Sequence, residues 1–99
     1  MPDISVAKSY GTPAIKAGGK LLIRVKDADT AVLMCPIEEK EFLFESAPAI
    51  YYETDHYKGW PSLLVRLGAI SDEELRLRME NAFRFKAPRK LVKAWESGT

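Results

Sequence analysis

The sequence predicts an α+β domain, with an antiparallel sheet of about five strands and helices packed on one face. Three observations support this class. Short runs of alternating apolar and polar residues follow one another, tight-turn residues join them, and only a few helical segments interrupt them. Neighbouring antiparallel strands with few helices are typical of α+β proteins. The 99 residues fit one domain, residues 1–99.

The beginning of the chain predicts a hairpin. Residues 1–13 are weakly patterned, and we expect a loop there with a short extended piece. A strand follows over residues 13–17. Gly18 and Gly19 then predict a tight turn, because adjacent glycines reach the positive φ that such a turn needs.

The next run alternates clearly and predicts a strand over residues 20–26. One face is expected to hold Leu21, Ile23 and Val25, and the opposite face Lys20, Leu22, Arg24 and Lys26. A turn over residues 27–29 leads into a third strand over residues 30–35.

A helix is predicted over residues 36–47, because Pro36 suits a first helical position and two glutamates follow it. Strands are expected over residues 50–52 and 62–68. In the second of these, Leu63, Val65 and Leu67 should point inward, and Leu64 and Arg66 outward.

Two further helices complete the chain. Ser71 and Glu74 form a capping box that begins one helix, and Ala87–Pro88 interrupts it. The last helix should run from Pro88 to about Glu96. The sheet face opposite the helices is expected to meet solvent, and it would present a row of cations interleaved with Leu22 and Leu64. These cations are Lys16, Lys20, Arg24, Lys26 and Arg66.

Composition indicates a cytoplasmic protein. The formal net charge is +1, and the single cysteine allows no disulfide within the chain. The sequence opens without a charged and apolar leader, and no apolar run approaches bilayer length, so we expect no membrane association. Cys35 follows an apolar run and is expected to be a buried structural thiol rather than a nucleophile.

The loop from Thr54 to Pro61 contains the one histidine, His56. Asp55 and Glu53 lie next to it, but three ligands that include sequence neighbours fall short of a metal site. We therefore expect no metal, no cofactor, no catalytic residue and no enzymatic activity. Trp60 is expected to be a core residue that closes the following strand.

Basic residues crowd the break between the last two helices, and no acidic residue lies among positions 84–93. Phosphates bind mobile cations and the free amides of a helix start, although a solvated helix face is the alternative. Tyr57 and Lys58 could stack on a base and meet a phosphate. We expect one continuous surface that contacts nucleic acid through Tyr57, Lys58, Arg66, Lys86, Arg89, Lys90 and Lys93.

Five segments, in order, resemble the MmcQ/YjbR-like family. They are Ser9–Ile15, Gly19–Leu21, Leu33–Pro36, His56–Leu67 and Ala87–Leu91. The resemblance runs from about Pro2 to Glu96. It implies a compact α+β domain of the bacterial frataxin-like (CyaY-like) fold, also described as a double-wing arrangement. It also implies a DNA-binding protein without enzymatic activity.

One departure from the family pattern concerns the N-terminal end. Family members usually begin with a helix that would finish where Met1–Ile4 stands. Either the true start lies upstream, or this is a shortened member of the family. If the helix is missing, we expect a bare apolar packing site on the sheet or the last helix, covered by a homodimer. The main hypothesis is weakly sequence-specific, phosphate-directed DNA binding, and the alternative is a protein–protein interaction module. A small-molecule binder or enzyme would need a deep pocket near His56 and Tyr57.

Overall fold

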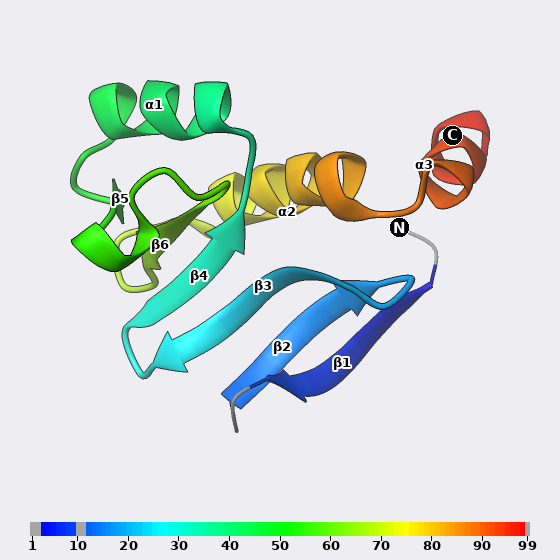
Figure 1. Cartoon of the computed structure of the whole chain (residues 1–99), viewed down its shortest axis with the longest axis horizontal. Coiled ribbons are helices and arrows are strands. Elements are labelled where there is room, and N and C mark those ends of the chain that lie inside the picture. The colour runs from blue at the N-terminus through cyan, green and yellow to red at the C-terminus, as the bar shows by residue number, and fades with distance from the viewer. Residues whose placement is uncertain (1–2, 10–11, 99) are drawn as a thin grey trace.

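The computed structural model describes residues 3–9 and 12–98. Over these residues the chain forms a six-stranded antiparallel sheet in the order β1-β2-β3-β4-β6-β5 (Figure 1). The strands are β1 Ile4–Ser9, β2 Thr12–Ala17, β3 Lys20–Asp27, β4 Thr30–Met34, β5 Tyr51–Tyr52 and β6 Ser62–Arg66. The helices are α1 Ile37–Ser46, the short 3-10 helix η1 Asp55–Tyr57, α2 Asp72–Lys86 and α3 Arg89–Ser97. The predicted α+β class is confirmed.

The first strand is longer than the extended piece predicted within residues 1–13. Residues 1–2 and 10–11 lie outside the described part of the chain. The short extended piece predicted there is the six-residue strand β1, which pairs with β2 along its whole length. Pairing with β2 decides this strand, because strand formation depends on cross-strand contacts more than on local preference.

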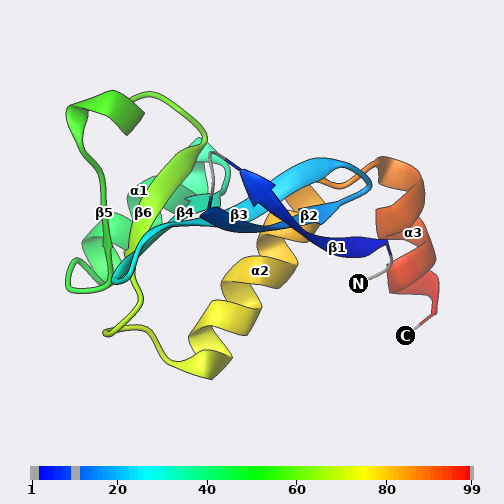
Figure 2. The same cartoon turned by 90° about the horizontal axis from the view of Figure 1, so that it is seen from below.

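The three predicted helices surround one core. α2 lies against one face of the sheet, while α1 and α3 lie towards its two ends (Figures 1 and 2). Met79, Ala82 and Phe83 of α2 are buried in the core, and α3 adds the partly buried Leu91 and Trp95. Burial of these apolar side chains supplies the main stabilisation of the fold.

A bulge reverses the predicted facing of two leucines in β3. The β2–β3 register shifts, so that Ile15 pairs with Ile23 but Lys16 pairs with Leu21. Leu22 is therefore fully buried in the core on the helix side, whereas Leu21 lies on the other face. The strict alternation expected for this strand was wrong. A bulge adds one residue, and the side chains on one side of the bulge then point to the opposite face of the sheet.

The sheet face away from α2 is not left open to solvent at its centre. Val32 and Leu64, which pair on this face, are 3% and 0% exposed. The segment between β5 and β6, which includes η1, lies on this side of the sheet (Figure 2). The predicted solvent face is therefore wrong at its centre, because a loop that is distant in sequence covers it.

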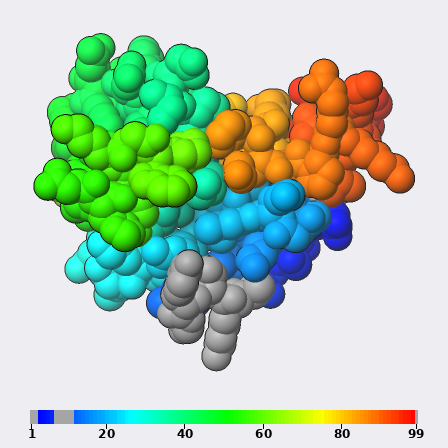
Figure 3. Space-filling view, viewed as in Figure 1, coloured from blue at the N-terminus to red at the C-terminus, as the bar shows by residue number. Residues whose placement is uncertain are grey.

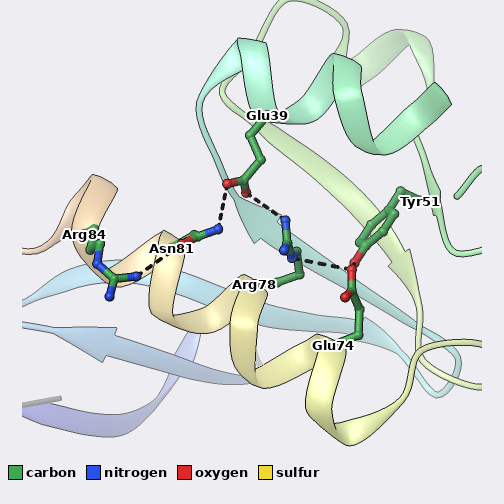
Figure 4. Close-up of polar contacts among 6 residues, drawn as sticks. All are labelled: Glu39, Tyr51, Glu74, Arg78, Asn81 and Arg84. Atoms are coloured by element: carbon green, nitrogen blue, oxygen red, sulfur yellow. Dashed lines mark hydrogen bonds and ion pairs between the residues drawn. The ribbon is translucent and has the colours of Figure 1, made fainter. Parts of the chain in front are cut away.

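A polar network joins α1, β5 and α2 (Figure 4). Glu39 accepts a hydrogen bond of 3.0 Å from Asn81 and lies 3.8 Å from Arg78. Arg78 also pairs with Glu74, which accepts a 2.5 Å hydrogen bond from the Tyr51 hydroxyl. Burial, and then the bond to Glu74, raises the pKa of Tyr51 above its ordinary range. The network fixes α1 relative to α2.

The helix that carries this network begins as predicted. The Ser71 hydroxyl accepts a 3.1 Å hydrogen bond from the Glu74 amide. The Glu74 carboxylate, expected to return to the Ser71 backbone, is directed towards Tyr51 and Arg78 instead. A buried hydroxyl that needs an acceptor explains this use of the side chain.

The tip of the β2–β3 hairpin packs against the start of α3. Gly18 and Gly19 both have positive φ, 56° and 82°. A Cβ atom on Gly18 would lie 2.9 Å from ring carbons of Pro88 and 3.0 Å from Leu91. A Cβ atom on Gly19 would have no neighbour within 4 Å among the described residues. Gly18 is thus required both by its conformation and by its neighbour.

This pair of glycines provides a matched test. Gly18→Ala should lower the free energy of unfolding by about 2–4 kcal/mol, because it adds overpacking to the strain of positive φ. Gly19→Ala should cost about 1–2 kcal/mol, since it carries the strain alone. Urea unfolding measures both values. Equal losses would contradict the contact between the hairpin and Pro88.

Candidate functional site

A cavity lies between the η1 loop and the sheet face opposite α2, and its volume is about 510 Å³. We call it the loop cavity. Its lining residues come from β3, β4, the loop and the start of β6. They are Leu21, Arg24, Val32, Met34, His56, Tyr57, Trp60 and Ser62. In Figure 3 the green loop segment lies directly beside the blue and cyan strands on the viewed face.

Tyr57 organises the polar side of the loop cavity. Its hydroxyl accepts a 3.1 Å hydrogen bond from Nη2 of Arg24, 33 residues earlier in the chain. Nζ of Lys26 lies 5.9 Å from the centre of the Tyr57 ring, and His56 meets the same ring edge-on at 5.0 Å. The arrangement places two cations around one phenol, with Arg24 at the cavity wall.

Trp60 lines the loop cavity with 64% of its surface exposed. The expectation that it would be a core residue is wrong. The Trp60 carbonyl accepts hydrogen bonds from Lys40 of α1 and from the Ser62 amide. The resulting turn leaves the indole outside the core. An exposed tryptophan beside a cavity is a usual feature of binding surfaces.

A buried lysine that the sequence analysis missed fixes this loop. Lys40 of α1 is only 3% exposed. Its ammonium group donates hydrogen bonds of 2.9 Å to the carbonyls of both Tyr57 and Trp60, and lies 2.6 Å from a carboxylate oxygen of Glu53. The available signal was its position, three residues before buried Leu43 on the stripe that faces the core.

The chemistry of Cys35 agrees with the expected buried thiol. The residue is fully buried, and burial, followed by the nearby Glu39, raises the pKa of its thiol to about 12. The thiol therefore stays protonated at neutral pH and is a poor nucleophile. Glu53, one of the three residues weighed as metal ligands, is paired with Lys40. Among the described residues, no three His, Cys, Asp or Glu side chains come together as a metal site.

The second group of candidate residues lies at the α2–α3 break. Arg89, Lys90 and Lys93 are exposed, and Lys86 is half-buried with its ammonium group 5.5 Å from the Phe85 ring. A smaller cavity of about 310 Å³ lies here, with Arg89 and Lys93 in its lining. We call these four cations the break cluster.

An acidic residue reaches the edge of the break cluster. Glu96 lies 3.5 Å from Arg84, whose guanidinium also covers the Trp95 ring at 4.7 Å. Although the sequence contains no acid over positions 84–93, one turn of α3 brings Glu96 back towards them. Arg84 is thus partly neutralised.

Six of the seven predicted site residues fall into two groups rather than on one continuous surface, and Arg66 belongs to neither group. Tyr57 and Lys58 lie on the η1 loop, and the break cluster lies by α3, at opposite ends of the longest axis of the molecule (Figure 1). The β2–β3 hairpin lies between them (Figure 3). Arg66, on β6, stacks on Tyr52 at 4.1 Å and donates to the Pro48 carbonyl. The expected continuity is wrong because the sheet separates the two ends.

The contacts of Lys40 predict a large effect on stability. Lys40→Met should lower the free energy of unfolding by about 3–5 kcal/mol, because Glu53 and two carbonyls lose their buried partner. Lys58→Met, an exposed lysine in the same loop, should change it by less than about 0.5 kcal/mol. Chemical unfolding gives both values, and hydrogen exchange should show faster exchange in residues 53–61 of Lys40→Met. A loss below about 1 kcal/mol would show that the loop does not depend on Lys40.

Comparisons with known proteins assign the chain to a family. The chain is 36% identical over 53 residues to an uncharacterized protein of Mycobacterium bovis, and equally to uncharacterized proteins of two Mycobacterium tuberculosis strains. The alignment covers 54% of this chain and 41% of each relative, so it spans less than half the length of those proteins. No solved structure matches. The family model named YjbR matches residues 1–85, and the chain therefore belongs to the YjbR family.

Proposed function

We propose that this protein is a non-enzymatic nucleic-acid-binding protein whose contacts are directed mainly to phosphate. The observation that carries the proposal is the break cluster, where three exposed cations stand on the first turns of α3. The first amides of α3 have no side-chain cap, because Pro88 occupies that position. Cations beside open amides suit phosphate.

The η1 loop supplies a second point of contact with a nucleic-acid strand. Lys58 and Trp60 are exposed there. A cation and an aromatic ring side by side suit an unpaired nucleotide, because the ring stacks on the base and the cation meets the phosphate. Asn or Gln side chains that could read base edges are missing from both groups among the described residues, so we propose weak sequence specificity.

Within the same described residues, no helix is long and apolar enough to cross a membrane.

The proposal predicts salt-dependent binding that relies on Arg89. Arg89→Glu should weaken binding to a DNA oligonucleotide about tenfold and make the slope of log K against log salt shallower by about 1. Arg76→Glu makes the same charge change at an exposed position on α2, outside the break cluster, and should bind almost like wild type. Fluorescence anisotropy at several salt concentrations measures both. Wild-type affinity that is absent at low salt, or that does not fall as salt rises, would refute the proposal.

A second candidate function, self-association, is favoured by an apolar groove of about 290 Å³. Val6, Ile15, Val25, Leu67 and Leu75 contribute to its lining, which lies between β1–β4 and the start of α2. Val6 is 79% exposed, and β1 is an edge strand that offers backbone groups for pairing. Two copies could cover both features by placing their β1 strands together.

Sedimentation distinguishes this second function. Wild type should sediment as a dimer, and Val6→Glu should be monomeric because a charge in the groove opposes burial. Phe42→Glu should remain dimeric, since Phe42 is an exposed apolar residue on α1 outside the groove. A monomeric wild type at concentrations of about 100 μM would exclude a homodimer of useful affinity.

A further inference from the structure

We propose that the loop cavity binds a flat organic anion: an aromatic or heteroaromatic ring that carries a carboxylate or a phosphate. This inference does not depend on the break cluster. It concerns a different end of the molecule, and it follows from the shape, the charge and the rigidity of the cavity.

The loop cavity has the size and lining of a small-molecule site. Its volume of about 510 Å³ lies within the ordinary range for ligand pockets. Leu21, Val32 and Met34 provide an apolar floor on the sheet. Tyr57 and Trp60 add aromatic rings from the loop. A floor and walls of this kind favour a flat, apolar ring over a flexible polar molecule.

The charge of the lining selects an anion. Among the described residues that line the cavity, Arg24 alone carries a full charge and none is acidic. A guanidinium is planar and can meet a carboxylate or a phosphate with two parallel hydrogen bonds. The Tyr57 hydroxyl holds Arg24 at 3.1 Å, which fixes the direction of its fork. His56 and Ser62 add side chains that can donate to a further ligand oxygen.

The site is built before a ligand arrives. Lys40 holds the carbonyls of Tyr57 and Trp60 at 2.9 Å each, so both aromatic walls are fixed from behind by α1. Ordering a loop on binding weakens affinity, and a preformed wall avoids that loss. The 64% exposure of Trp60 then has a physical reason, because a stacked ring would cover it.

Proton–nitrogen NMR spectra of the ¹⁵N-labelled protein provide the test, with benzoate and AMP as ring-bearing anions. Both should give saturable shifts at the Trp60 indole N–H and at the amides of His56 and Tyr57. The Trp95 indole, on α3, should stay unchanged. Acetate supplies the charge without a ring and benzyl alcohol the ring without a charge, and neither should saturate. Equal binding of benzyl alcohol, or no shift from either anion at about 10 mM, would overturn the proposal.

Variants connect the shifts to the proposed contacts. Arg24→Met keeps most of the side-chain length without the charge and should weaken anion binding about tenfold or more. Trp60→Ala should weaken it by several-fold, and the exposed position makes misfolding a minor concern. Arg76→Met removes an exposed cation of α2 that lies outside the loop cavity and the break cluster, and it should leave binding unchanged. Unaltered affinity in a folded Arg24→Met, judged by its spectrum, would overturn the proposal.

The same measurements separate the two sources of such an anion. Tight binding of AMP, displaced by a single-stranded oligonucleotide, would support a nucleotide of a strand as the ligand. Benzoate binding that the oligonucleotide does not displace would support a free aromatic acid. DNA binding that depends on Arg89, together with an empty loop cavity, would overturn this inference and leave the proposed function intact.

Discussion

The buried ammonium group of Lys40 is the interaction on which the candidate site depends. One side chain from α1 bonds to two carbonyls of the loop and to the carboxylate of Glu53. A charge that is 3% exposed is tolerable only when hydrogen bonds and an opposite charge compensate it in this way. Because the same helix is tied to α2 through Glu39, the loop is fixed relative to the whole core.

The two faces of the sheet serve different purposes as a result. One face forms the core with α2, and its side chains are packed in the ordinary way. The opposite face carries a loop that leaves space beneath it, and the space contains Arg24 and two aromatic rings. A rigid sheet below and a clamped loop above are the conditions under which a surface cavity keeps its shape.

The cations of the two candidate sites lie at the two ends of the molecule. The hairpin tip at Gly18 touches Pro88, which sets the start of α3 beside the sheet and directs the cations of the break cluster to that end. The loop cavity, with Arg24, belongs to the other end. The uncharacterized relatives and the YjbR family match provide a family for this chain, and the arrangement of these two ends provides the physical basis for its proposed functions.

Much of the fold could be predicted from local signals. Adjacent glycines predicted the β2–β3 hairpin, Pro36 with two glutamates predicted the start of α1, and Ser71 predicted the start of α2. These succeed because turns and caps are decided by a few neighbouring residues. The buried state of Cys35 also followed from its apolar neighbours.

The site was decided by contacts between distant residues. The burial of Lys40, the exposure of Trp60 and the bond from Arg24 to Tyr57 each depend on segments separated by 17 to 33 residues. The facing of Leu21 and Leu22 depended on a bulge, which strand alternation does not reveal. The sequence by itself determined which elements form, since hydrogen bonding within turns and helices is local. Only the tertiary structure decided which side chains meet above the sheet, because that requires the loop, α1 and β3 to be packed together.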